Sequence, residues 1–508
     1  MVGLLHIGGY VVLVLGLLFV LDFFREVRYW ILSARNGCET PKYVSNFPFG
    51  LRGLWNMLRC HRNNEFYENT VRMVDNVGRK TYRAQVVGGV LMTTIEPENI
   101  KALLATQFKE FDLGTRHSEF RPLLGDGIFT LSGDGWYHSR ALLRPQFTNE
   151  QVSQLKNLEL HTNTLLEIFK EQSSCGKPVD IQQYFFKLTL DTATEFLFGE
   201  STDTLSLGRK PDDSHLGKME EFAEAFNTGQ LWLVYRSLSQ TAHPLVTGKE
   251  FRRCTKICHQ FVDKYVQRAL ERAEKLEEDR YIFLDQLTKE TTDPVLMRDQ
   301  ALNILLAGRD TTAGLLSFTI SLLLRHKHVW YKLREAVLSD FGDSTENISF
   351  HTLKRCEYLK HVINETLRLY PIVPINFRRA TCNTTLPRGG GPDEQSPVYV
   401  EKGTTVLYYT YALQRRKEYW GEDADDFRPE RWMEGKKVLP WTYIPFNGGP
   451  RICLGQQFAL TEASYVLVRI AQTFSEVHST PEFESSPIKQ YATLTSSVAG
   501  GVPALFKE

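Results

Sequence analysis

The sequence predicts a protein that is mainly α-helical with a smaller β part, preceded by one N-terminal transmembrane helix. Three observations predict this class: an apolar run at the N-terminus, apolar residues at helical spacing through the middle of the chain, and two short stretches rich in β-branched and aromatic residues. The chain has 508 residues, 42% of them hydrophobic, which is enough for a large core. No repeat or composition break divides the globular part, so we expect one large domain there.

The N-terminal run extends from Leu4 to Phe24 and reads LLHIGGYVVLVLGLLFVLDFF. About 20 apolar residues at a rise of 1.5 Å span roughly 30 Å of hydrocarbon. Basic residues follow the run, from Arg25 to Lys42, and none precedes it, which places the C-terminal side in the cytosol. A cleaved signal peptide would need a basic N-terminal region and a shorter apolar core. We therefore expect a single-pass anchor over residues 1–25, a linker over 26–50 and the globular domain over 51–508.

Charge and cysteine content argue against two classes of protein, those that bind nucleic acid through bulk charge and those built on a disulfide framework. Lys+Arg and Asp+Glu both total 60, so the chain has no bulk charge with which to bind nucleic acid. The 8 cysteines are sparse and form no regular framework, which indicates reduced intracellular thiols. Cys254, Cys258 and His259 lie close together, but no second ligand pair follows them. We interpret them as ordinary helix residues.

Several elements can be placed along the globular part. Residues 80–97 predict a hairpin broken at Gly88-Gly89, and Pro97 opens a helical pattern that runs to about Thr106. Apolar residues at helical spacing fill the region from about 150 to 340. A second strand-like stretch covers 397–407, and a helix is predicted over 456–474.

The most specific signal is a motif around Cys453. Residues 446–455 read FNGGPRICLG and match F-x-x-G-x-R-x-C-x-G, for which about 10⁻⁴ chance matches are expected in a chain of this length. A thiolate at Cys453 can ligate a metal, while Gly449 and Gly455 allow the backbone to bend sharply. Arg451 can pair with an anionic group, and the N-terminus of the helix that follows favours a negative sulfur. The alternative is a buried cysteine that acts as a small hydrophobe; the surrounding motif favours the ligand.

Three further patterns carry polar chemistry. Glu365 and Arg368 lie one helical turn apart, so their charges can meet on one face. Two other pairs with this spacing, at 250–253 and 277–280, we interpret as solvated surface charge. Trp136 and Arg140 also share a helix face.

The third pattern is the run from Ala307 to Thr312, which places Asp310 and two hydroxyls in an otherwise apolar helical stretch. Polar residues on a helix face are the ordinary interpretation. Gly308 would permit a local opening of the helix at this point.

These motifs together resemble the cytochrome P450 family. The run from Phe446 to Gly455 is similar to the cysteine-ligand loop of that family, although the family usually has Gly where this chain has Asn447. The resemblance implies the cytochrome P450 fold, heme b (iron protoporphyrin IX) as cofactor, Cys453 as the ligand of its iron, and a monooxygenase reaction. A cysteinate ligand favours cleavage of the O–O bond.

The resemblance also implies roles for residues outside this loop. Asp310 and Thr311 would be catalytic and relay protons to oxygen, and Glu365, Arg368 and Arg431 would form a buried structural triad. The residues implied to hold the heme are Trp136, Arg140, Arg378, Phe446, Arg451 and Gly455. Apolar residues implied to contact a lipophilic substrate are Ala307, Val373, Ile375 and Leu494.

Residues 446–462 and 427–432 resemble, more narrowly, the yeast P450 group that hydroxylates n-alkanes and fatty acids, which implies hydroxylation at the terminal (ω) position. The chain has no dinucleotide-binding G-x-G-x-x-G after a strand, so electrons would come from NADPH-cytochrome P450 reductase, with cytochrome b5 as a further partner, at the endoplasmic-reticulum membrane. The alternatives are a monooxygenase acting on another lipophilic substrate, such as a sterol, and a heme-thiolate isomerase or dehydratase. The acid–hydroxyl pair of Asp310 and Thr311 argues against an isomerase or dehydratase.

Overall fold

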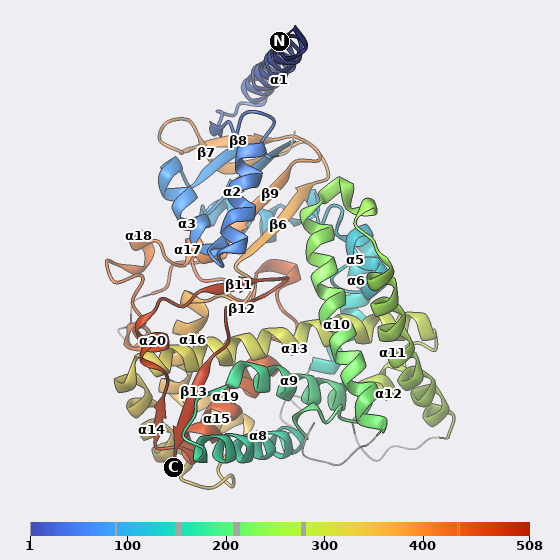
Figure 1. The fold of residues 1–508 in the computed structure, drawn as a ribbon, viewed down its shortest axis with the longest axis vertical. Coiled ribbons are helices and arrows are strands. Elements are labelled where there is room, and N and C mark those ends of the chain that lie inside the picture. The colour runs from blue at the N-terminus through green and yellow to red at the C-terminus, as the bar shows by residue number, and fades with distance from the viewer. Residues whose placement is uncertain are drawn as a thin grey trace. The chain divides into compact units, whose positions relative to one another are not determined.

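The computed structural model describes residues 2–86, 89–147, 155–206, 214–275, 281–433, 435 and 437–508. The chain forms two compact units (Figure 1). Unit 1 comprises Met1–Gly114, Val373–Ala424 and Val438–Ile452, and unit 2 comprises Thr115–Ile372, Asp425–Lys437 and Cys453–Glu508.

Unit 1 combines short helices with most of the described strands. Its helices are α1 (Val2–Arg35), α2 (Leu51–Arg62), α3 (Phe66–Val77), α4 (Pro97–Lys101), α17 (Thr410–Leu413) and α18 (Lys417–Trp420), and a π-helical turn (Ala102–Thr106) continues α4. Its strands are β1 (Lys42–Val44), β2 (Thr81–Val86), β3 (Gly89–Thr94), β4 (Phe111–Asp112), β6 (Ile375–Ala380), β7 (Thr384–Gly390), β8 (Ser396–Val400) and β9 (Thr405–Tyr409).

The main sheet of unit 1 has six strands in the order β1-β2-β3-β9-β6-β4. β2 and β3 pair antiparallel with Thr81 opposite Thr94, which confirms the predicted hairpin; Gly88, where the break was predicted, lies outside the described residues. The stretch predicted as one strand over 397–407 is two, β8 and β9, because the chain turns at Gly403 with φ +86°. Alternate side chains of the sheet, among them Tyr82, are buried in the core of this unit.

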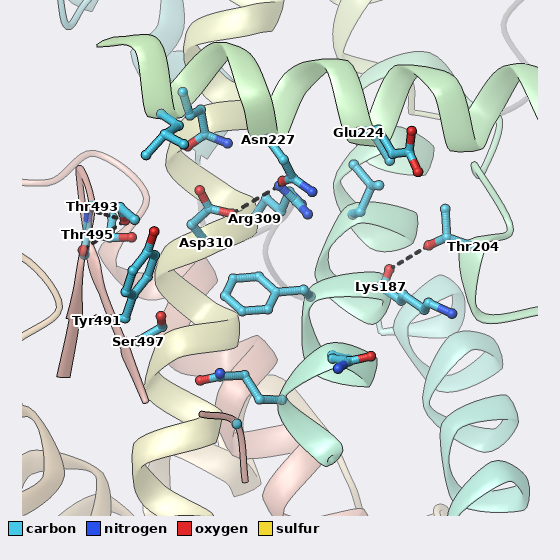
Figure 2. Close-up of a pocket in the computed structure, with 18 of the residues that line it drawn as sticks. Lys187, Thr204, Glu224, Asn227, Arg309, Asp310, Tyr491, Thr493, Thr495 and Ser497 are labelled. Atoms are coloured by element: carbon cyan, nitrogen blue, oxygen red, sulfur yellow. Dashed lines mark hydrogen bonds and ion pairs between the residues drawn. The ribbon is translucent and has the colours of Figure 1, made fainter. Parts of the chain in front are cut away.

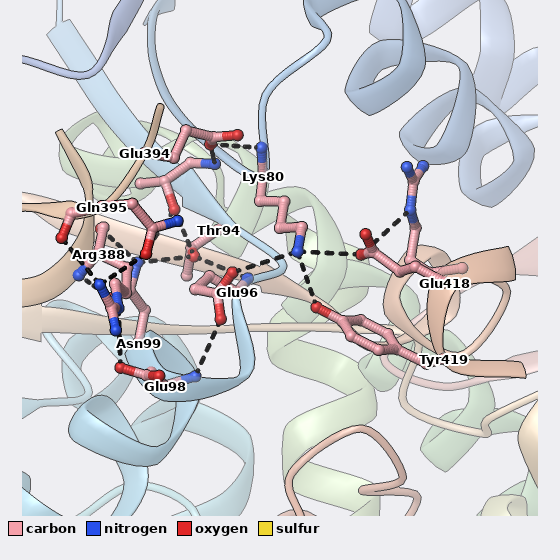
Figure 3. A network of polar contacts seen from close by, with 12 residues as sticks. Lys80, Thr94, Glu96, Glu98, Asn99, Arg388, Glu394, Gln395, Glu418 and Tyr419 are labelled. Atoms are coloured by element: carbon pink, nitrogen blue, oxygen red, sulfur yellow. Dashed lines mark hydrogen bonds and ion pairs between the residues drawn. The ribbon is translucent and has the colours of Figure 1, made fainter. Parts of the chain in front are cut away.

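A polar network ties the start of the hairpin to the rest of unit 1 (Figure 3). The backbone N–H of Lys80 donates to Glu394 at 2.7 Å, and its ammonium lies 3.2 Å from Glu418. Asn99 is fully buried and donates to the carbonyl of Arg388 at 2.8 Å. The buried Asn99 amide is thus satisfied, and these bonds link the hairpin to the segments around Arg388 and Glu418.

The second half of α1 is docked on unit 1. The Tyr29 hydroxyl donates to the carbonyl of Tyr399 at 2.6 Å, and Arg83 pairs with Glu26 at 2.7 Å while lying over the Tyr29 ring. The helix continues to Arg35 and so occupies the first part of the predicted linker. Among the described residues, we find no helix that combines the length and the hydropathy of a membrane span.

Unit 2 is mainly helical, as predicted for the region from 150 to 340. Its helices are α5 (Arg116–Leu124), α6 (Gly133–Leu143), α8 (Lys156–Ser174), α9 (Ile181–Phe198), α10 (Ser214–Leu238), α11 (Lys249–Lys275), α12 (Phe283–Leu287), α13 (Pro294–Arg325), α14 (Lys327–Phe341), α15 (Phe350–Arg355), α16 (Glu357–Leu369), α19 (Gln456–Thr473) and α20 (Pro481–Ser485). Its strands are β5 (Val179–Asp180), β10 (Glu476–His478), β11 (Gln490–Ala492), β12 (Ser496–Val498) and β13 (Pro503–Lys507).

Helix α13 runs through unit 2 and packs against α9, α11, α16 and α19 (Figure 1). Its start is set by Asp293, whose side chain accepts from the N–H of Val295, and by Pro294 in the first turn. Strand β12 lies so close that a Cβ at Gly314 would be 2.8 Å from the Ser496 carbonyl. The helix is α-helical throughout, including at Gly308, where a local opening was expected.

Cys254 and Cys258 lie within α11, next to His259. Cys254 and Cys258 are buried, and the His259 ring lies 2.9 Å from the Leu123 carbonyl. Across the part of the chain that the structure describes, no group of three His, Cys, Asp or Glu side chains could hold a metal ion.

Candidate active site

Cys453 stands three residues before the first residue of α19 in unit 2, with Gly455 as the N-cap of that helix. Its side chain is solvent-accessible, whereas Cys254, Cys258 and Cys356 are buried. The thiol is nevertheless crowded by protein atoms, and this desolvation raises its pKa. The N–H of Gly455 and the Arg140 guanidinium lower the pKa of the thiol, because both stabilise the thiolate. An accessible sulfur with an N–H donor and a cation beside it has the donor set that a thiolate–metal bond requires.

Helix α6 carries both donors predicted from its sequence. Trp136 is buried, and the Arg140 guanidinium carbon lies 5.9 Å from the centre of its ring. Desolvation lowers the pKa of Arg140, and the Cys453 sulfur offsets part of this effect. The two donors therefore share one helix face, in the unit that also holds the cysteine.

The part of the cysteine loop that belongs to unit 1 is a tightly packed turn. Gly449 has φ +65°, and a Cβ there would lie 1.7 Å from the carbonyl oxygen of Leu104. Asn447, which stands where the resembling family usually has Gly, adopts φ +66°. Asn tolerates this left-handed conformation better than most residues, and its side chain accepts from the Tyr408 hydroxyl at 3.0 Å.

Two arginines of unit 1 fit the anionic groups of a heme. Arg378 on β6 is 2% exposed and donates to the Phe377 carbonyl at 2.7 Å. Within the described residues its Nε is buried and has no hydrogen-bond acceptor, so this guanidinium fits an anion that the protein itself does not supply. Arg451 lies over the ring of Phe108 at 6.0 Å, and Phe446 is half-buried.

Asp310 and Thr311 lie in the middle of α13. Asp310 is 9% exposed and lies 3.3 Å from Arg309. Burial raises the pKa of Asp310, and Arg309 and a hydrogen bond from Gln230 lower it. Thr311 is half-buried, and its hydroxyl donates to the Ala307 carbonyl at 2.6 Å. A raised pKa makes the carboxyl a weaker acid than an exposed aspartate, which is a property suited to proton transfer.

A cavity of about 900 Å³ opens beside Asp310 in unit 2. It is bounded by α9, α10, α13 and the hairpin β11–β12, and Figure 2 shows Asp310 and Arg309 on its wall, with Asn227 of α10 bonded to Arg309. Many of its lining residues are polar, among them Lys187, Glu224, Thr493 and Ser497.

The residues predicted to contact substrate do not line this cavity. Ala307 and Leu494 are half-buried in unit 2, where Leu494 packs on the apolar core, and Val373 and Ile375 are half-buried in unit 1. The cavity beside Asp310 is therefore lined by other residues than the apolar set named from the sequence.

Glu365, Arg368 and Arg431 meet in the interior of unit 2. Glu365 and Arg368 are fully buried and are joined by two hydrogen bonds of 2.9 Å. Arg431 donates to Glu365 at 2.7 Å, and the Trp432 indole N–H donates to its other oxygen at 3.0 Å. The backbone N–H of Arg428 adds a further bond at 3.1 Å. Every charge in the cluster is thus compensated.

Some members of these groups were not predicted as functional. The Trp432 indole N–H donates a hydrogen bond to the Glu365 carboxylate. Its position next to Arg431 in the sequence was the signal that could have identified it. Asn227 and Gln230 lie on α10, far from α13 in the sequence, and nothing in their spacing pointed to Asp310.

Comparison with known proteins agrees with this geometry. The family model described as cytochrome P450 matches residues 46–497. Cytochrome P450 52A12 of Debaryomyces hansenii is 50% identical, with 90% of each chain covered. Cytochrome P450 52A6 of Candida tropicalis is 48% identical over 91% of each chain, and cytochrome P450 52-E3 of Starmerella bombicola is 48% identical over 97% of this chain and 98% of its own. The chain therefore belongs to the cytochrome P450 family and is a heme-thiolate monooxygenase.

Proposed function

We propose that the protein hydroxylates long-chain aliphatic substrates, n-alkanes, fatty acids or both, at the terminal (ω) position. It would use O2 and electrons delivered by NADPH-cytochrome P450 reductase, with cytochrome b5 as a second electron donor. The observation that carries the monooxygenase reaction is the Cys453 loop. The substrate class is supported by the resemblance of residues 446–462 and 427–432 to the yeast hydroxylases of alkanes and fatty acids.

The residues proposed to hold the heme are those that the cysteine motif and the family resemblance single out. Cys453 would ligate the iron, and Phe446 and Gly455 would border the macrocycle. Arg140, Arg378 and Arg451 would pair with the two propionates, to which the Trp136 indole N–H would donate a hydrogen bond. Bound heme supplies the redox chemistry that activates O2. Guanidinium and indole donors suit propionates because charge-assisted hydrogen bonds are strongest in a poorly hydrated site.

Asp310 and Thr311 are proposed to handle protons. The Asp310 carboxyl borders the cavity of unit 2, and burial raises its pKa, so it binds a proton more readily than an exposed aspartate does. The Thr311 hydroxyl, which donates to the Ala307 carbonyl, can rotate to pass a proton onward. Ala307, Val373, Ile375 and Leu494 remain the proposed apolar contacts of an aliphatic substrate, and they would exclude water from it.

We also propose that residues 1–25 anchor the protein in the endoplasmic-reticulum membrane, with 26–50 as the connection and 51–508 as the cytosolic catalytic domain. Large apolar side chains of α1 support this. Leu13 is 69% exposed, Phe19 62% and Phe24 63%, so a long stretch of apolar surface lacks cover within the described residues. Arg25 and Arg28 follow the stretch, as the positive-inside rule requires of a cytosolic flank.

The decisive test of the ligand is spectroscopic. Purified full-length protein, reduced and given carbon monoxide, should show the Soret band of a sulfur-ligated heme, and Cys453→Ala should abolish it. Cys382→Ala, which removes another exposed thiol, is the matched control and should keep the band. Retention of the band in Cys453→Ala would exclude this ligand.

The substrate is tested by product analysis in membranes that also contain the reductase. Dodecane and lauric acid should give terminally hydroxylated products that require NADPH, and Asp310→Asn should slow their formation by roughly 10²-fold, the lower range for loss of a general acid. Product from lanosterol, with none from dodecane or lauric acid, would replace the proposed substrate class with sterols.

A further inference from the structure

A second pocket of unit 2 is lined mainly by basic and polar side chains. It has a volume of about 460 Å³ and lies where α5, α10, α11 and α13 pack together (Figure 1). Among the described residues that line it are four permanent cations, Arg236, Arg252, Lys256 and Arg298, and one acid, Asp263. A small pocket with such an excess of positive charge suits an anionic ligand.

Two of these cations have their partners within the protein. Arg236 of α10 is 5% exposed and donates to backbone carbonyls of α5 and of the segment after α10, at 2.7–3.2 Å. Arg298 of α13 donates to Asp299 at 3.2 Å and to Asp263 at 3.4 Å. These two arginines therefore form a wall of the pocket whose charges the protein itself has already engaged.

The other two cations stand one turn apart on α11, where Arg252 and Lys256 share one helix face. Both residues are exposed, and within the described part of the chain neither side chain forms an ion pair or a hydrogen bond. Burial and the nearby Arg298 lower the pKa of His259, so this lining residue adds no positive charge at neutral pH. Like charges at this spacing disfavour a helix, so an anion between them would stabilise it.

The same face of α11 carries a hydroxyl that lacks a hydrogen bond. The Thr255 oxygen is buried, lines the pocket and has no partner among the described residues. Buried threonines in other helices of this protein donate to the carbonyl four residues earlier, as Thr162 does at 2.6 Å and Thr194 at 2.9 Å. A buried hydroxyl without a partner is costly, so the Thr255 hydroxyl points to an acceptor oxygen that a ligand supplies.

The lining also defines the chemical class of the ligand. Two unpaired cations and one hydroxyl can together satisfy the oxygens of a carboxylate, and a guanidinium can bind both of its oxygens. Pro122 and Phe251 add apolar surface to the same pocket. The pocket therefore suits a carboxylate that is attached to an alkyl chain.

Helix α13 sets the distance between this pocket and the proposed catalytic pair. Arg298, at the pocket, and Thr311 are 13 positions apart, which corresponds to about 20 Å along the helix. The hydrocarbon core of a bilayer is about 30 Å thick and contains two opposing layers of acyl chains, so one chain extends about 15 Å. The separation along α13 is thus of the order of one long acyl chain.

We propose that this pocket binds the carboxylate of a long-chain fatty acid, with Arg252, Lys256 and the Thr255 hydroxyl as its donors, and so directs the ω end of the acid towards Asp310 and Thr311. The proposal rests on the proposed function, because it names the group of the fatty acid that the protein recognises. An n-alkane has no such group, so the pocket contributes to the binding of the acid alone.

Binding is measured without turnover, by calorimetric titration of the full-length holoenzyme with lauric acid below its micellar concentration. The double variant Arg252→Gln/Lys256→Gln should raise the Kd for lauric acid roughly tenfold, because two partly exposed ion pairs are lost. The Kd for 1-dodecanol, which has the same chain length without the charge, should not change. Equal losses for the acid and the alcohol would overturn the proposal.

The matched control is Arg253→Gln/Lys264→Gln, which removes an exposed arginine and an exposed lysine of α11 that do not line the pocket. This variant should bind lauric acid as the wild type does. A loss as large as that of Arg252→Gln/Lys256→Gln would show that the total charge of α11 is responsible, and would overturn the assignment of the pocket.

Thr255→Val separates binding of a ligand from support of the fold. It should raise the Kd for lauric acid roughly threefold to tenfold, which is the effect of losing one hydrogen bond to a charged acceptor. It should not lower the melting temperature of the protein without ligand, because the hydroxyl that it removes has no partner there. A lower melting temperature with an unchanged Kd would overturn the assignment of this hydroxyl to the site.

Turnover with reductase and NADPH separates the pocket from the proposed function. Arg252→Gln/Lys256→Gln should raise the KM for lauric acid roughly tenfold and leave the KM for dodecane unchanged. Absence of product from both substrates would contradict the proposed function, while the calorimetric titration would still test the pocket. Product from both, with the wild-type KM for lauric acid in the double variant, would overturn the pocket alone. Unchanged binding of lauric acid, with weaker binding to vesicles that contain an anionic phospholipid, would assign the two cations to the membrane surface and would also overturn it.

Discussion

At the scale of single residues, burial decides which charged side chains contribute to the stability of the fold. Glu365 and Glu250 each stand three residues before an arginine, but only Glu365 is fully buried. Its carboxylate accepts from Arg368, Arg431 and Trp432, so its removal would leave two guanidinium groups in the interior. Removal of a charge at the surface leaves its partner hydrated and costs little.

Glu365→Ala should therefore destabilise the protein by about 3–5 kcal/mol, the range for stranding a buried charge. Denaturant unfolding, followed by circular dichroism, measures the loss. Arg253→Ala removes the exposed arginine of the pair at 250–253 and should change the free energy of unfolding by less than about 0.5 kcal/mol. Equal losses in the two variants would contradict a buried triad.

Glu462, a buried acid of α19, makes a second prediction at this scale, on stability. Burial raises its folded-state pKa to about 7, above the ordinary value of 4.5, so the folded protein holds the proton more tightly than the unfolded chain does. The stability from this group is full below pH 4.5 and declines as the pH rises, until the folded carboxyl is also charged above pH 7. The decline amounts to at most about 3 kcal/mol.

Glu462→Gln cannot ionise, so its free energy of unfolding should fall less than that of the wild type between about pH 5 and pH 8. Melting temperatures across this range measure the difference. A steeper fall in the variant than in the wild type would mean that the folded-state pKa of Glu462 is not raised.

At the scale of elements, the cysteine loop shows that two glycines of one motif have different roles. A Cβ at Gly449 would overlap the Leu104 carbonyl, and its φ of +65° is unfavourable for other residues. A Cβ at Gly455 would meet only the Phe147 ring, at 3.6 Å, which is an ordinary contact. The first glycine is thus required by the packing of the chain on itself, and the second is not.

Gly449→Ala should lower the melting temperature and the fraction of protein that incorporates heme, because the turn and the Leu104 backbone must both shift. Gly455→Ala should keep the melting temperature of the wild type and, if Gly455 borders the macrocycle as proposed, lose heme content alone. Heme per protein and thermal unfolding are measured on the same samples. A stable Gly449→Ala variant with full heme content would contradict the close approach to Leu104.

At the scale of the whole molecule, α1 combines two surfaces along one helix. Its first part is apolar and exposed, and its second part is bonded to unit 1 through Glu26, Arg28 and Tyr29. The anchor that we propose would thus continue into a rigid helix fixed on its own unit, instead of ending in a flexible tether.

Two truncations separate these parts. Deletion of residues 2–21 should release the protein from membranes and leave the melting temperature unchanged. Deletion of residues 2–35 should also lower the melting temperature, because the buried Tyr29 ring and the pair between Arg83 and Glu26 are lost. Vesicle flotation and calorimetry measure the two effects. Equal melting temperatures would show that the second half of α1 adds no stability.

The sequence by itself determined the features that depend on neighbouring residues. These are the thiolate motif at Cys453, the hairpin over 80–97, the predominance of helix and the helix after Gly455. Each follows from spacing within one element, where 3.6 or 2 residues per repeat fixes which side chains share a face. The family followed from the same local motifs, because a motif of five defined residues is rarely matched by chance.

Only the tertiary structure decided which elements meet. Trp432 reaches Glu365 across 67 positions, and Thr192 reaches Glu462 across 270. It also brought α9, α10, α13 and the hairpin β11–β12 together around the cavity beside Asp310. The physical reason is that hydrogen bonds between distant segments depend on the path of the whole chain, and residue spacing within one helix carries no information about that path.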